Sequence, residues 1–575
     1  IVGFEPPPNI YYQINNLKKI YNKMAETLLS PGVLTRENDQ SQITQGPITA
    51  GAAIVGPTVK GPVRIPTLVT SYSDYINKFG GSFVSGGATH EYLTSISAYN
   101  YFQQGGTTLL VTRVVSGTFA PATSSVLLAN TSASFTLETL SWGANQNSAG
   151  TIGPNGTLDS GSVDHIRWEI TNSDTGSGTF NLIIRRGDDS TKSKVILESY
   201  SGLSLDPTSP NYIEAVIGNQ TINTDNGFTD ITGDYPNKSR YVRVKLVSTP
   251  TPNYFDNNGV AKSIYTASIP LPGSGSFGGS FGGATGDLSG VYGLSNDDYT
   301  SSLKLLSNPD EFKYNVITVP GLTQASNSTA ISLLLTNTQN RGDAIAVVDL
   351  VGKDVTTINE VVDKATKIDN SYAAAYWPWV QVNAPNTGKL TWVPTSTIIP
   401  GVYAYNDRVS APWFAPGGFT RGGLSVVQAA KKLSPTDRDT LYAGKVNPIA
   451  TFPGQGVVAY GQKTLQQKAS SLDRINVRRL LIELKSYIGQ VANTLVFEQN
   501  TFATRNKFLS QVNPYLDSIQ QRQGLYAFKV VMDETNNTAD VIDRNQLVGQ
   551  IFIQPTRTAE FVVLDFNVSP TGASF

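Results

Sequence analysis

Two stretches of the 575-residue chain carry the pattern of a parallel α/β sheet, and a stretch of different composition separates them. Residues 46–115 and 311–420 alternate continuous apolar runs, such as ITAGAAIVG, with segments of helical spacing. Continuous apolar strands separated by helices are typical of parallel sheets that are covered on both faces. The pattern therefore predicts an α/β domain that begins in the first stretch and resumes in the second.

The separating stretch, residues 116–300, is rich in Ser, Thr, Asn and Gly and contains short alternating runs such as HIRWEI and YVRVKLV. This alternation is typical of strands with one buried face, so we expect an inserted all-β domain. Near its end, Gly273, Gly275 and Gly278 spell a G-x-G-x-x-G dinucleotide motif. No helical pattern follows the motif at once, so we interpret this run as a flexible linker and not as a phosphate-binding turn.

The last part of the chain, residues 421–575, combines two helical patterns with alternating strands. An apolar stripe at helical spacing runs through residues 475–495, and a second helix is expected from about Thr501 to Gln523. Strands are expected in YAFKVVMD, LVGQIFIQP and EFVVLDFNV. The last of these places four apolar side chains on one face, those of Val562, Leu564, Phe566 and Val568.

The N-terminal residues 1–45 contain a helical pattern that the SPG at 30–32 breaks. An alternating segment, VLTREN, follows it and has no core of its own. We interpret it as an arm, and a disordered tail is the alternative. The arm strand is expected at Val33, Leu34, Thr35 and Arg36.

Composition excludes several classes of protein. The chain has no cysteine, which rules out disulfides and thiolate zinc sites, and its two imidazoles belong to His90 and His165. A net charge of −1 provides no global field to attract nucleic acid, and no run of 18 or more apolar residues predicts a transmembrane helix. The loops after Val319 and Asp349, where parallel sheets often bind ligands, offer no catalytic constellation. We therefore expect no enzymatic activity, no catalytic residue, no cofactor and no metal.

One helix carries a row of basic residues. The segment 471–491, SLDRINVRRLLIELKSYIGQV, contains Arg474, Arg478, Arg479 and Lys485. One interpretation is a solvated helix face whose ion pairs, with partners such as Asp473 and Glu483, contribute a few tenths of a kcal/mol each. The other is that this face meets acidic groups of a partner protein.

Ten segments, taken in order, resemble the contractile tail sheath proteins of bacteriophages and related injection machines. They are SPGVLTRE (30–37), residues 52–80, SYAAAYWPWVQV (371–382), APWFAPGGFTRG (411–422), RDTLYAGKVNPI (438–449), GQKTLQ (461–466), LDRINVRRLLIELKSYI (472–488), FEQNT (497–501), NNTADVID (536–543) and IQPTRTAEFVVLDF (553–566). Residues 116–300 and those before Ser30 match nothing in that family, so the resemblance assigns them no role.

The resemblance implies a multi-domain α/β fold with an all-β insertion and an α+β C-terminal domain that bears strand-exchange arms. The implied domains are an N-terminal arm (1–45), the first part of the sheath α/β domain (46–115), a β-rich insertion on the outer surface (116–300), a central α/β domain of subtilisin-like but non-catalytic fold (301–420), a C-terminal domain facing the tube (421–556) and a C-terminal arm (557–575).

The resemblance also implies a function. Such subunits form stacked hexameric rings around a tail tube and shorten to drive the tube through the host envelope. Their arms add strands to neighbouring subunits, which here assigns that role to the two predicted arm strands. The basic helix face would meet the tube, and the implied partners are copies of the chain, the tail tube protein, and the baseplate and tail terminator proteins, with no nucleic acid. The implied location is the virion tail, assembled in the host bacterial cytoplasm.

Three alternatives stay open at this point. The chain could be the sheath of a bacteriocin or of another contractile injection system. The insertion could be an adhesive module that binds carbohydrate through Trp168 and nearby tyrosines, although aromatic residues of β domains usually lie in the core. A hydrolase on the α/β domain would need a Ser-His-acid arrangement, and residues 311–575 contain no histidine.

Overall fold

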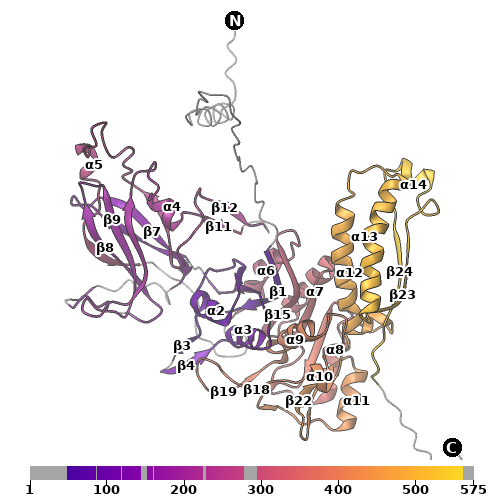
Figure 1. Ribbon diagram of the computed structural model, residues 1–575. Coiled ribbons are helices and arrows are strands. Elements are labelled where there is room, and N and C mark those ends of the chain that lie inside the picture. The colour runs from indigo at the N-terminus through magenta and orange to yellow at the C-terminus, as the bar shows by residue number, and fades with distance from the viewer. Residues whose placement is uncertain are drawn as a thin grey trace, which may run out of the picture. The chain divides into compact units, whose positions relative to one another are not determined.

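The computed structural model describes residues 48–560, except residues 86, 118–119, 144–151, 154, 160, 225–227 and 278–293 (Figure 1). The predicted arm residues lie outside the described residues, so their strand roles stay predictions. They are Val33, Leu34, Thr35, Arg36, Val562, Leu564, Phe566 and Val568. Among the described residues, no helix is both long and apolar enough to span a membrane.

An eight-stranded sheet of order β2-β5-β1-β15-β16-β17-β21-β22 forms the centre of the described fold. All its inner pairs are parallel, and only the two edge strands pair in antiparallel fashion. The strands are β1 (Ile48–Gly56), β2 (Thr67–Val69), β5 (Leu109–Arg113), β15 (Phe312–Thr323), β16 (Ile345–Asp349), β17 (Ala373–Trp377), β21 (Asn447–Phe452) and β22 (Gly456–Ala459). The two predicted stretches thus build one sheet.

Helices cover both faces of this sheet, as the continuous apolar runs predicted. Neighbouring residues of β1 belong to different cores, because Ala53 packs in one apolar cluster and Ile54 in the other. One cluster takes side chains from α6 (Asn296–Leu305), α7 (Ser328–Arg341), α8 (Ile358–Thr366) and α11 (Pro435–Ala443). The other takes them from α2 (Tyr72–Phe79), α3 (Leu93–Gln103) and α9 (Ile399–Val409).

Two features of this domain differ from the sequence-based prediction. The sequence HEYLTSISAYNYFQQ (90–104) predicts a helix from His90, but the helix begins at Leu93, because residues 88–91 form β4 (Ala88–Glu91), which pairs with β3 (Ser82–Ser85). The ring of His90 lies 5.8 Å from that of Phe83 on the partner strand. The sheet also continues past residue 420, where the end of the central domain is expected, since β21 and β22 complete it.

Several short elements connect the sheet to the rest of the chain. They are β18 (Val380–Asn383), β19 (Leu390–Val393), the 3₁₀ turn η2 (Thr395–Thr397), α10 (Gly418–Arg421), β20 (Gln428–Ala429) and the 3₁₀ turn η3 (Ser471–Asp473). Strands β19, β18 and β20 form a small antiparallel sheet of their own. It shares the core that α3 and α9 occupy.

The inserted stretch folds into two antiparallel sheets around one core, as the alternation predicted. One sheet contains β6 (Pro121–Leu127), β7 (Ala133–Trp142) and β13 (Val242–Val247), and the other contains β8 (Ile166–Asp174), β9 (Thr179–Arg186), β10 (Ile196–Ser204) and β14 (Gly273–Ser276). Phe135 of the first sheet stacks on Phe180 of the second, with ring centroids 5.5 Å apart. Smaller elements are α4 (Ile213–Ile217), β11 (Thr221–Asn223), β12 (Asp230–Thr232) and α5 (Ser263–Thr266).

The glycine-rich run begins as a strand, so the prediction of a linker is wrong for its first residues. Gly273 and Gly275 lie in β14, which pairs with β8, whereas Gly278 lies outside the described residues. A Cβ at Gly275 would come within 2.4 Å of the ring of Trp168. The glycine is therefore a packing requirement of the strand. Trp168 itself is buried and donates its indole N–H to Ser124 Oγ at 2.7 Å, which confirms that it is a core residue.

A buried ion cluster lies beside this core. The guanidinium of Arg185 binds Asp189 through two hydrogen bonds, Nε to Oδ2 at 2.7 Å and Nη2 to Oδ1 at 2.8 Å. Nη1 of Arg167 lies 3.3 Å from the same Oδ1, and all three side chains are buried. Because two cations share Asp189, its carboxylate is the group that makes their burial tolerable.

We predict that Asp189→Ala destabilises the insertion by about 3–5 kcal/mol, because it leaves the buried Arg167 guanidinium without an acid and leaves Arg185 with Glu169 alone. The matched control is its neighbour Asp188→Ala, which removes an exposed pair with Arg186 and should cost at most about 1 kcal/mol. Urea unfolding of both variants measures the difference. Equal effects of the two substitutions would contradict the importance of the buried cluster.

Candidate functional site

The C-terminal part of the described chain is a helical hairpin covered by a two-stranded sheet. Helices α12 (Ile475–Asn493) and α13 (Phe502–Gln521) pack together, and β23 (Leu525–Val531) pairs in antiparallel fashion with β24 (Gln550–Pro555). Between the strands lies α14 (Ala539–Asp543). These elements confirm both predicted helices and two of the three predicted strands, and Pro514 lies inside α13 as expected.

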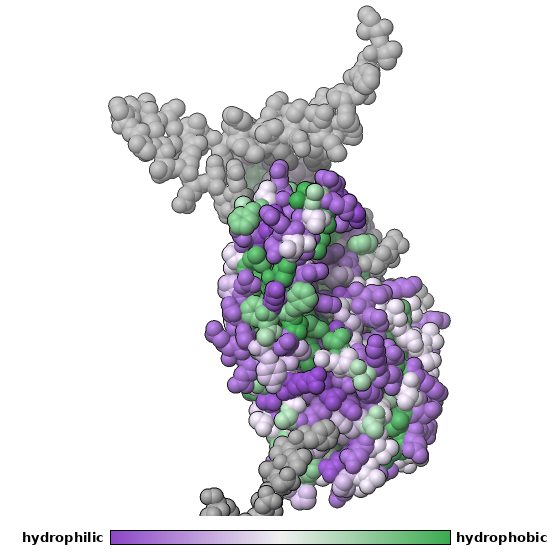
Figure 2. All heavy atoms as spheres, turned by 90° about the vertical axis from the view of Figure 1, so that its right-hand side faces the viewer, coloured by the Kyte–Doolittle hydropathy of each residue, from purple (hydrophilic) through white to green (hydrophobic). Residues whose placement is uncertain are grey.

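The sheet packs one face on the helices and exposes the other. Phe528, Val530, Ile551 and Ile553 are half-buried against the apolar cluster of α12 and α13. On the strands, Tyr526 and Phe552 are 62% and 56% exposed. Figure 2 views the molecule from the right-hand side of Figure 1. It shows hydrophobic side chains gathered in a band over the upper half of this face.

Both strands have an edge that nothing else in the described chain pairs with. The sheet is β23-β24 and includes no further strand within residues 48–560 as described. A two-stranded sheet is marginal on its own, and an open edge presents unpaired N–H and C=O groups to any strand that approaches. We call this two-stranded sheet, with its open edges and exposed apolar side chains, the acceptor sheet.

The basic residues of α12 lie in three different environments. Arg474 precedes the helix and binds Glu560 with Nε to Oε1 at 2.7 Å and Nη2 to Oε2 at 3.1 Å. Glu560, which also accepts a hydrogen bond from Gln462 Nε2 at 3.0 Å, is the last described residue. Arg474 therefore fixes the last described residue to the start of α12.

Arg478 and Arg479 are buried, each only 4% exposed. Arg478 donates to Ser371 Oγ and its guanidinium lies 4.0 Å from the centroid of the Tyr372 ring. Burial lowers the pKa of the Arg478 guanidinium. These contacts join α12 to the segment that leads into β17.

Arg479 makes the second link between α12 and the central domain. It pairs with Asp407 of α9, and its guanidinium lies 4.9 Å from the centroid of the Tyr403 ring. Tyr403 in turn shares a hydrogen bond of 3.0 Å with Tyr376 on β17. The two arginines thus tie α12 to the large sheet through aromatic and polar contacts.

The single basic face that the sequence suggests is therefore divided. Lys485 is exposed, with Nζ 3.3 Å from the Tyr372 hydroxyl, whereas Arg478 and Arg479 are committed to partners within the chain. Neither sequence-based interpretation anticipated this burial, because α12 is covered by the sheet domain as well as by α13. A tube-facing role for Arg474, Arg478, Arg479 and Lys485 stays a prediction.

The carboxyl end of the central sheet contains one buried acid. Asp349, the last residue of β16, accepts hydrogen bonds from Ser396 Oγ at 2.5 Å, from Ser396 N at 3.2 Å and from Thr395 Oγ1 at 3.3 Å. Burial raises the pKa of Asp349 to about 6, and the hydrogen bonds from Ser396 and Thr395 oppose this rise. Among the described residues, no group of three or more acidic or imidazole side chains is placed to hold a metal ion. The hydrogen bonds of Asp349 hold η2 against the end of β16.

The described chain thus combines a mixed α/β body with an open two-stranded sheet, and open sheet edges in general are places where an extended strand can add. Family models agree with the domain order seen here. Residues 293–465 match the central domain of phage tail sheath proteins, and residues 467–569 match the phage tail sheath C-terminal domain.

Individual phage proteins with similar sequences are also named tail sheath proteins. The tail sheath protein of Vibrio phage KVP40 is 34% identical over 354 residues, which are 56% of this chain and 51% of that protein. The tail sheath protein of Enterobacteria phage T4 is 39% identical over 209 residues, which are 36% of this chain and 31% of that protein. These matches span about half or less of the relatives' length. By these matches, residues 293–569 are similar to the central and C-terminal domains of phage tail sheath proteins.

Solved structures show the same fold over nearly the whole chain. The crystal structure of a sheath tail protein from Listeria innocua has a TM-score of 0.51 and 11% identity, and covers 89% of this chain and 96% of that one. A chain of the anti-feeding prophage baseplate has a TM-score of 0.50 and 15% identity, and covers 95% of this chain and 100% of that one.

We predict that Arg479→Met destabilises the attachment of α12 by about 2 kcal/mol, because it removes a charge-assisted hydrogen bond and leaves Asp407 without its cation. Lys485→Met on the exposed part of the same helix is the matched control and should change stability by less than about 0.5 kcal/mol. Urea unfolding together with hydrogen exchange of the α12 amides measures both. A larger effect at Lys485 than at Arg479 would refute the prediction.

The raised pKa of Asp349 predicts a pH dependence. The folded protein binds a proton at about pH 6 that the unfolded chain, with an ordinary pKa of 3.8, releases. The contribution of this group to stability therefore falls as pH rises from about 4 to 6.5, by on the order of 3 kcal/mol. Asp349→Asn removes the titration, so the wild type should lose stability relative to this variant over that window. A pH-independent difference in the urea midpoint would disprove the assignment.

Proposed function

We propose that the chain is the structural subunit of a contractile tail sheath and that it polymerises by strand addition to the acceptor sheet. The observation that carries the proposal is the open pair β23–β24, whose edges have no partner within the described residues. Strand addition supplies main-chain hydrogen bonds for affinity, and alternating side chains fix the register. The similarity of residues 293–569 to tail sheath domains supports the same function.

The proposed donors are the two terminal arms. Val562, Leu564, Phe566 and Val568 alternate along the C-terminal segment, and Val33–Arg36 lie in the N-terminal one. A strand that one copy donates to the next makes a heterologous contact, which closes into rings or continues as a helix according to its rotation. Six-fold rings stacked around a tube, linked by arms that persist while the bodies slide, form the proposed assembly.

The proposed partners follow from this assembly. Besides its own copies, the sheath meets a tail tube protein inside, and baseplate and tail terminator proteins at its ends. The extended sheath is held by contacts that form a barrier, and contraction releases energy stored during assembly, so the chain needs no catalytic site. The virion tail, built in the host cytoplasm, is the proposed location.

We predict that Leu564→Ser combined with Phe566→Ser abolishes polymer formation and leaves the body folded, because both substitutions remove apolar contacts from one face of the donated strand. The matched control changes the opposite face with Asp565→Asn and Asn567→Ser, and should polymerise normally. Electron microscopy and sedimentation of the purified full chain measure assembly, and circular dichroism monitors folding. Normal polymers from the first variant would overturn strand donation by this arm.

A peptide experiment tests the acceptor directly. A peptide of residues 556–575 added in excess should occupy the acceptor sheet and reduce assembly of the full chain, whereas the same peptide with both serine substitutions should not. Equal inhibition by the two peptides would argue against a side-chain-specific strand site.

A further inference from the structure

The loop that joins α12 to α13 presents three apolar side chains to solvent. Phe497 is fully exposed, and Val496 and Phe502 are 59% and 70% exposed. We call these three residues the apolar knob. Single exposed apolar residues are ordinary on a protein surface, but a cluster that includes two phenylalanines marks an interaction surface.

The backbone and its contacts hold the apolar knob in place. Phe497 has a φ of 69°, a left-handed conformation that is costly for an aromatic residue and persists where the surroundings enforce it. Leu495 is buried in the core of the hairpin on one side of the loop. On the other side, Asn500 Nδ2 donates to Asn537 Oδ1 at 3.2 Å and to the carbonyl of Gln546 at 2.9 Å. The knob is thus pre-organised, which lowers the entropy cost of binding.

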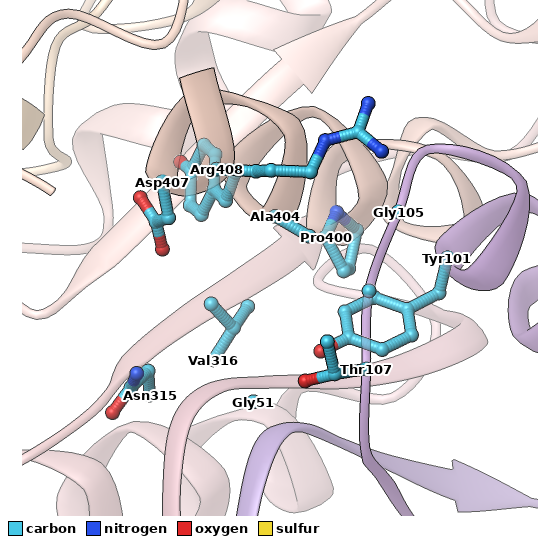
Figure 3. Close-up of a pocket in the computed structure, with 12 residues that line it drawn as sticks. Gly51, Tyr101, Gly105, Thr107, Asn315, Val316, Pro400, Ala404, Asp407 and Arg408 are labelled. Atoms are coloured by element: carbon cyan, nitrogen blue, oxygen red, sulfur yellow. The ribbon is translucent and has the colours of Figure 1, made fainter. Parts of the chain in front are cut away.

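A pocket of about 340 Å³ lies on the central domain, between α3, α9 and β15 (Figure 3). Its wall includes Tyr101, Val316, Pro400 and Ala404, and its rim includes Asp407 and Arg408. A Cβ at Gly106 would come within 2.2 Å of the Tyr101 ring, so glycine is needed here for the wall to form. The volume and the mixed apolar and polar lining fit an aromatic side chain. We call this pocket the socket.

The charges beside the apolar knob and the socket are complementary. Asp407 on the rim is already paired with Arg479, whereas the exposed Arg408 forms no ion pair within the described residues. Glu498 follows Phe497 in the loop, and its one ion-pair partner among the described residues is Lys507, at 3.9 Å. The pair is exposed and long, so Glu498 is available to a second cation at little cost.

We infer that the apolar knob of one copy of this chain docks in the socket of a second copy, with Phe497 against the apolar wall and Glu498 against Arg408. The inference rests on the proposed function, because it needs copies to be neighbours in a polymer. Knob and socket lie on different elements of the same chain, so the contact is heterologous and propagates from copy to copy. In the proposed polymer this contact joins the folded bodies of two copies directly, in addition to the exchange of arm strands.

Cysteine cross-linking tests the contact, because the chain contains no cysteine of its own. Phe497→Cys and Ala404→Cys in one full-length chain should give, on oxidation of assembled protein, a ladder of covalent multimers on a non-reducing gel. Each single substitution should give dimers at most. Polymers that form from the double variant and yield no ladder would overturn the inference and leave the proposed function intact.

A charge exchange provides an independent readout. Glu498→Arg and Arg408→Glu should each raise the critical concentration for assembly by about tenfold or more, and the double exchange should restore assembly. A double variant no better than either single one would overturn the pairing. If Phe497→Ser assembles like the wild type without a tube, the knob serves another protein and the inference fails. If the wild type itself forms no polymer, the proposed function fails.

Discussion

The backbone groups of a strand need partners, and β23 and β24 provide them only for each other. The large sheet solves the same problem within one chain by drawing strands from residues 48–113, 312–377 and 447–459 and by closing both ends with antiparallel strands. The acceptor sheet is left at two strands over a helical hairpin with a substantial apolar core. In the proposed polymer, a strand from another copy completes this sheet.

Charged residues are few, and a small number of them are buried and paired within the chain. Only 15% of the residues are charged. Several arginines form ion pairs and hydrogen bonds that hold elements of the chain together. Arg167 and Arg185 bind Asp189 and so hold the loop that follows β9 against the sheet of the insertion. Arg478 and Arg479 hold α12 to the central domain. A guanidinium suits this role because it stays charged when buried and stacks on aromatic rings.

The sequence predicted the elements that are fixed by local pattern. Strand β1 has the predicted bounds, since a strand buried on both faces reads as an unbroken apolar run. Local pattern misassigns Gly275 because its role depends on Trp168, and it misassigns Gly273 because the strand that pairs with it, β8, is equally far away in the chain. Burial of Arg478 and Arg479 could not be predicted either, because their partners Tyr372 and Asp407 belong to other domains. The burial of these two arginines is determined by residues that are distant in the sequence. The spacing of residues within α12 therefore does not reveal it.

The insertion leaves the sheet after β5 and returns through α6 to β15, and both strands are direct neighbours of β1. Because the insertion starts and ends at strands that flank β1, the β sandwich can change in length or in fold without any change in the strand order of the large sheet.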